Sequence, residues 1–106
     1  MTRDENDGRI DKIKAAVETI HRCKAVHDDT ALVVERMGDQ VVWEGLVESF
    51  GIFAPPGQPK PKAKRCYGWS FNDGKEDQFV AVLELPPVTS HETAVRAYIS
   101  SLNRPI

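Results

Sequence analysis

The sequence predicts a single α+β domain whose elements follow the order α-β-β-β-β-α. Apolar residues recur at helical spacing near both ends of the chain. Two turn signals, Gly38-Asp39 and Asp73-Gly74, each divide a pair of segments rich in strand-forming residues. We expect the four strands to form one antiparallel sheet and the two terminal helices to pack on one face of it.

The first helix is expected over residues 8–23. Ile10, Ile13, Val17 and Ile20 recur at spacings of three and four residues, which places them on one side of an α-helix. The preceding residues 1–7 are rich in acidic side chains, and we expect them to form a flexible N-terminus. The remaining residues, 8–106, have the size of one domain, and a chain that is 41% hydrophobic and 28% charged is not disordered as a whole.

Two hairpins are expected in the middle of the chain. In the first, a β-branched run over residues 30–37 precedes Gly38-Asp39 and a second strand over 41–53. A helix over residues 30–37 would be short and uncapped, and therefore unstable. Residues 54–64 contain four prolines and three lysines and are expected to form a solvated loop. The second hairpin then pairs residues 65–71 with residues 78–85.

The last helix is expected after Pro86-Pro87, which ends the last strand. Thr89 and Glu92 have the spacing of a capping box, with Ser90 as the alternative cap. The apolar stripe of this helix comprises Ala94, Val95, Tyr98, Ile99 and Leu102.

Apolar side chains occupy both faces of the predicted sheet, which is unusual for an antiparallel sheet with helices on one side. Seven of the eight aromatic residues lie between Trp43 and Phe79. The second face therefore needs a cover: a second copy of the chain, a small ligand or the loop 54–64. We expect a homodimer first. The candidate residues for this face are Trp43, Glu44, Leu46, Glu48, Phe50, Tyr67, Trp69 and Phe71.

These observations favour a small binding or interaction protein, without deciding whether it is an enzyme. The first alternative is a small enzyme or ligand carrier with an apolar pocket. Its rim would consist of Glu44, Glu48 and Glu84, together with His27.

The second alternative is an RNA-binding domain that uses the basic end of the loop. Lys60, Lys62, Lys64 and Arg65 are candidate contacts for a polyanion, and two aromatic residues follow them closely. The net charge of −2 argues against nucleic acid as a partner.

The sequence indicates neither a metal nor a cofactor. His21, Cys23, His27 and Cys66 are the soft ligands available, but their spacing is not that of a zinc finger. Whether these four residues meet in the fold is left open. The phosphate-binding and hydrolase signatures are also missing from the sequence.

No stretch is apolar enough to act as a signal peptide or to span a membrane, so we expect a cytoplasmic protein that does not contact membranes. The two cysteines are then expected to be reduced.

Two strand segments resemble a pattern found in small uncharacterised bacterial proteins. Residues 43–50 follow W-x-G-x-V-x-x-F, and residues 61–69 follow P-x-A-x-x-C-Y-x-W. The resemblance covers about residues 40–100. It implies a small α+β domain of the kind often encoded by mobile elements such as integron cassettes, and it implies no activity.

Overall fold

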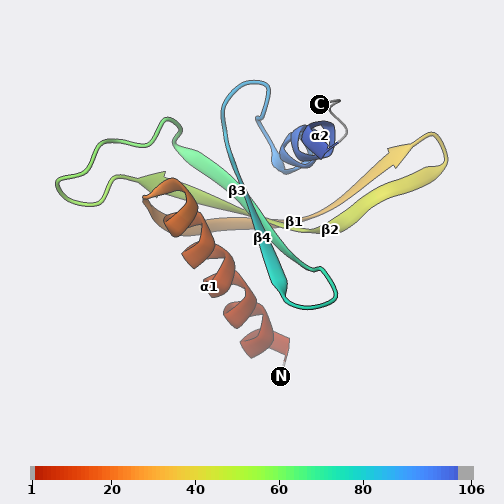
Figure 1. Ribbon diagram of the computed structural model, residues 1–106, viewed down its shortest axis with the longest axis horizontal. Coiled ribbons are helices and arrows are strands. Elements are labelled where there is room, and N and C mark those ends of the chain that lie inside the picture. Colours follow the sequence, from red (N-terminus) through yellow and green to blue (C-terminus); the bar gives the residue numbers. More distant parts are fainter. Residues whose placement is uncertain (1, 103–106) are drawn as a thin grey trace.

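The computed structural model describes residues 2–102 and shows two helices and four strands (Figure 1). The elements are α1 (Thr2–His21), β1 (Lys24–Met37), β2 (Gln40–Phe53), β3 (Arg65–Asn72), β4 (Asp77–Leu83) and α2 (His91–Leu102). The strands form one antiparallel sheet in the order β1-β2-β3-β4. The predicted class and element order are therefore confirmed.

Helix α1 begins six residues earlier than predicted, at Thr2, so that it includes most of the segment assigned to a flexible N-terminus. The predicted boundary at residue 8 was therefore too late. Acidic residues are frequent in this segment of the sequence, and negative charge stabilises the N-terminal end of a helix. Met1 lies outside the described residues.

The two helices lie on opposite faces of the sheet, which corrects the prediction that they share one face (Figure 1). Successive residues of a strand point to opposite faces. On β3, Cys66 packs in the cluster that contains α1 residues, and its neighbour Tyr67 packs in the cluster that contains α2 residues. The physical reason is that both faces of the sheet are apolar, and each helix covers one of them.

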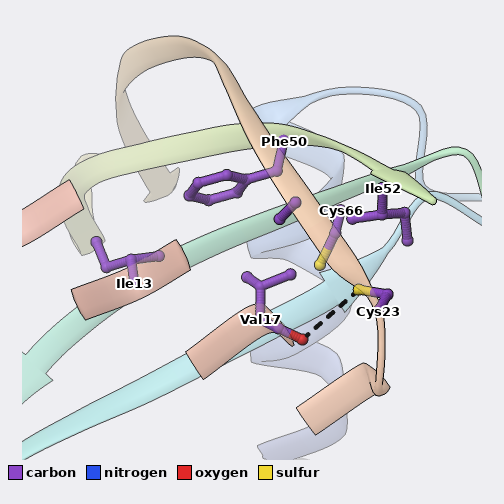
Figure 2. Packing of buried hydrophobic residues seen from close by; sticks show 7 residues of the cluster. Ile13, Val17, Cys23, Phe50, Ile52 and Cys66 are labelled. Atoms are coloured by element: carbon purple, nitrogen blue, oxygen red, sulfur yellow. Dashed lines mark hydrogen bonds between the residues drawn. The ribbon is translucent and has the colours of Figure 1, made fainter. Parts of the chain in front are cut away.

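Each helix therefore builds its own core. Under α1, Ile13 and Val17 meet Phe50 and Cys66 of the sheet (Figure 2). A glycine allows this close approach, since a Cβ atom at Gly68 would lie 2.8 Å from Cγ2 of Ile13. The other cluster, under α2, consists of Val33, Val47, Tyr67, Trp69, Val88, Ala94 and Val95.

The C-terminus of α1 places a non-glycine residue in the left-handed region. Arg22 has a φ of 52°, and the N–H of Cys23 donates to the carbonyl oxygen of Glu18 at 3.1 Å. These are the features of a Schellman motif, whose left-handed position is usually glycine. A residue with a Cβ atom costs about 1 kcal/mol there.

Strands β1 and β2 extend far beyond the rest of the sheet. They pair from Lys24–Phe53 to Met37–Gln40, whereas β3 pairs only with residues 48–51 of β2. Residues 30–47 thus form a two-stranded ribbon with its turn at the far end, which we call the arm (Figure 1). The radius of gyration is 14.3 Å, compared with about 13 Å for a compact chain of this length.

Candidate functional site

One face of the arm is covered by α2. Val33 and Val47 are buried there, and Arg96 of α2 forms an ion pair with Glu35 of the arm, with Nε 2.8 Å from Oε1. These contacts join α2 to the arm.

The opposite face of the arm is apolar and exposed. Leu32 lies opposite Leu46 in the strand register, and Val34 lies opposite Glu44. The exposed fractions are 64% for Leu32, 43% for Leu46 and 38% for Val34. We call these four residues the arm face. Leu46 and Glu44 were among the residues predicted for an uncovered sheet face.

The outer edge of β1 is open as well. Within residues 2–102, no strand pairs with this edge. Asp29 and Glu35 bound a stretch, residues 30–34, that contains no charge, and a register irregularity lies between His27 and Asp29. Charges and bulges protect edge strands from pairing with other chains, and residues 30–34 have neither.

The eight residues predicted for one sheet face do not form one surface. The register places half of them on the α1 side: Glu44, Leu46, Glu48 and Phe50. The other half lie on the α2 side: Trp43, Tyr67, Trp69 and Phe71. The difference arises because Trp43, Tyr67 and Trp69 pack in the cluster beneath α2, whereas Phe71 remains exposed. Trp69 is buried between the rings of Trp43 and Tyr98, with ring centroids 5.4 and 5.3 Å apart.

Glu48 is a fully buried carboxylate at the base of the arm. Its Oε2 lies 2.7 Å from Nη2 of Arg9, which belongs to α1, and its Oε1 lies 2.8 Å from Nε2 of His27. The Thr30 hydroxyl donates a further hydrogen bond to Oε1. The predicted pocket rim includes both Glu48 and His27, whereas no sequence pattern points to Arg9. This network connects α1 to both strands of the arm, and its partners offset the cost of burying a charge.

The three carboxylates of the predicted pocket rim lie apart. Glu44 is exposed on the arm, and Glu48 is buried beneath α1. Glu84 is on the α2 side, where its carboxylate accepts a hydrogen bond from the Tyr67 hydroxyl. Burial, together with this hydrogen bond, raises the pKa of Tyr67 to about 12. The three residues therefore do not surround one cavity.

The basic residues of the predicted polyanion contact also separate. Lys60, Lys62 and Lys64 are exposed on the loop after β2. Arg65 forms an ion pair with Asp28, which holds the pKa of that carboxyl below its ordinary value. Arg65 is therefore already paired within the fold, whereas the side chains of the loop lysines are exposed to solvent.

The four predicted soft ligands do not converge. Cys23 and Cys66 pack in the core beneath α1, where the Cys23 thiol points to the carbonyl oxygen of Val17 at 3.9 Å (Figure 2). His21 bonds through Nε2 to the carbonyl oxygen of Ala81 at 3.0 Å, and His27 is held by the carboxylate of Glu48. Among the described residues, no three His, Cys, Asp or Glu side chains are placed to hold a metal ion.

Stability is expected to fall at high pH because of Cys66. Burial raises the pKa of its thiol from 9.0 to about 12. Between these values the unfolded chain releases the proton that the folded chain keeps, so the contribution of this thiol to stability is constant below pH 9 and decreases as the pH rises toward 12. Urea unfolding at a series of pH values should show this decrease in the wild type and a shallower one in Cys66→Ala. Equal slopes in the two proteins would contradict this assignment.

Comparisons with protein-family models, curated proteins and solved structures gave no match. None of the described helices is long and apolar enough to cross a membrane.

Proposed function

We propose that this chain is a binding protein that self-associates through its arm, with β1 of one copy pairing with β1 of a second copy. The observation behind the proposal is the combination of an exposed arm face with an uncharged, unpaired edge at residues 30–34. An isolated two-stranded ribbon is marginally stable in water. Helix α2 covers one face of the arm, and a second copy would extend the ribbon by pairing with its edge.

The charges along β1 favour one register for this pairing. With a two-fold axis perpendicular to the sheet, the arm faces of both copies lie on the same side of the joined sheet. The allowed registers are therefore those in which opposite residues point to the same side. When Val33 lies opposite Val33 of the second copy, Leu32 lies opposite Val34, and Thr30 opposite Arg36. Leu32, Val34 and Leu46 of the two copies then form one continuous apolar patch, with Glu44 of each copy at its margin.

The neighbouring registers are less favourable. A register centred on Leu32 places Asp29 opposite Glu35 of the second copy, and like charges directly opposite each other destabilise a sheet. A register centred on Val34 places Leu32 opposite Arg36, which removes an apolar pair. The sequence of the edge therefore favours pairing with an identical edge in the register centred on Val33.

The oligomeric state tests this proposal. Light scattering across a concentration series should give a mass of twice 11.9 kDa for the wild type. Leu32→Lys should shift the mass toward that of the monomer, because it replaces the apolar cross-strand neighbour of Val34 of the second copy with a charged side chain. Val26→Lys is the matched control, since Val26 is 58% exposed on the same strand but lies outside the proposed pairing.

A monomeric wild type at all concentrations would overturn the proposal, as would equal dissociation of the two variants. Circular dichroism should show the same secondary structure for both variants. A reducing compartment such as the cytoplasm is consistent with this proposal, because both cysteines are free thiols in the core.

A further inference from the structure

A partly enclosed hollow of about 480 Å³ lies between the C-terminal end of α1 and the loop after β2. This volume is within the range of small-molecule sites. It lies at the end of the sheet where β1 begins, away from residues 30–34. Its lining includes Ile20, Arg22, Gln58, Lys60, Lys62 and Leu83.

The lining is cationic and contains no carboxylate. Arg22, Lys60 and Lys62 supply the charge, in a chain whose net charge is −2. Elsewhere the arginines Arg9, Arg65 and Arg96 each form an ion pair with a carboxylate. Among the residues whose side chains the structure describes, Arg22 and Arg36 have no such ion pair. The hollow therefore holds cations that the fold does not neutralise.

The wall formed by the loop is arranged in advance of any ligand. The N–H of Gln58 donates to the carbonyl oxygen of Pro55 at 3.1 Å, which closes a turn at the start of the loop. At its end, the carbonyl oxygen of Lys64 accepts from the N–H of Ile52 at 3.0 Å. Between these points prolines alternate with lysines, and each proline restricts the backbone. Little conformational freedom of the loop backbone is left to be lost on binding.

Arg22 occupies a backbone position that favours glycine. Its φ of 52° is in the left-handed region, and the Schellman bond from Cys23 to Glu18 holds it there. Strained residues cluster at ligand clamps. Arg22 thus occupies this position at a cost in stability, at the rim of a hollow lined by two further cationic side chains.

We infer that this hollow binds a small phosphate-bearing molecule, with Arg22 as the principal contact. A guanidinium group can bind two phosphate oxygens at once, and Lys60 and Lys62 add positive charge. Ile20 and Leu83 offer apolar surface to the organic part of the ligand. A hollow of this size in a chain of net negative charge suits a small ligand better than a nucleic acid.

An NMR titration with adenosine monophosphate and inorganic pyrophosphate tests the inference. Amide signals of Arg22, Gln58, Lys60 and Lys62 should shift. Arg22→Gly should weaken the binding of adenosine monophosphate by about tenfold or more. The same variant should raise the melting temperature by roughly 4 °C, because glycine relieves the left-handed position. Lys75→Ala, in the exposed β3–β4 turn, is the control and should alter neither property.

The inference fails if millimolar adenosine monophosphate and pyrophosphate leave these signals unchanged, or if Arg22→Gly binds as the wild type does. It also fails if a single-stranded RNA binds through the same residues more tightly than adenosine monophosphate, since the ligand would then be a nucleic acid. Dimer formation is a separate property, because none of these residues lies in the proposed pairing of β1.

Discussion

Arg9→Met is expected to lower the free energy of unfolding by about 3 kcal/mol, because it removes the cationic partner of a fully buried carboxylate. The Arg9 guanidinium lies 2.7 Å from Oε2 of Glu48, whose side chain has no exposure to solvent. Methionine keeps much of the apolar stem of arginine, so the decrease in the free energy of unfolding measures mainly the effect of removing the charge. Urea unfolding of the two proteins at neutral pH measures the difference.

A second substitution separates the charge from the packing. Adding Glu48→Gln to Arg9→Met removes the carboxylate that has lost its arginine partner and keeps its shape, and most of the lost stability should return. If the double variant is less stable than Arg9→Met alone, then Glu48 is not held chiefly by Arg9. In that case His27 and Thr30 would be its main partners.

Trp69→Ala is expected to cost about 4 kcal/mol, because it removes the largest fully buried side chain of the protein. The indole lies between Trp43 and Tyr98, so its loss would loosen the contact between α2 and the sheet. Trp69→Phe should cost much less, because the indole Nε1 is buried without a hydrogen-bond partner. Chemical denaturation monitored by circular dichroism measures both variants.

Phe71→Ala is the matched control for Trp69→Ala. Phe71 is on the same strand and points to the same side, but it is exposed. Its removal should change stability by less than about 1 kcal/mol. If Trp69→Ala lowered the free energy of unfolding as little as Phe71→Ala does, the packing of α2 against Trp69 would be contradicted.

The element order could be predicted because helical spacing, turn residues and prolines act locally. Ile13 and Val17 identify α1, and Asp73-Gly74 identifies the second hairpin. Which face each helix covers depends on long-range packing. The neighbouring residues Cys66 and Tyr67 pack in different cores, so the strand is apolar on both faces. This pattern indicates that each helix covers one face of the sheet.

The candidate sites could be predicted only in part. Leu46 was identified as a surface residue because the strand pattern is apolar on both sides. The sequence does not predict the arm, because the arm exists only where β2 has no partner in β3, and β3 pairs with just residues 48–51 of β2. Arg9 contacts Glu48 across the sheet–helix interface, and Arg22 approaches the loop after β2. Neither contact has a spacing signature in the sequence.

Disulfide trapping tests the pairing of β1 with β1 most directly. Residues opposite each other in an antiparallel pair have Cα atoms about 4.5–5.5 Å apart, which suits a disulfide. We predict that a mixture of Leu32→Cys and Val34→Cys proteins forms a cross-linked dimer under mild oxidation, and that neither protein alone does so. The native thiols of Cys23 and Cys66 are buried and do not compete. Absence of the cross-linked dimer from the mixture, or equal cross-linking of either protein alone, would contradict the proposed assembly.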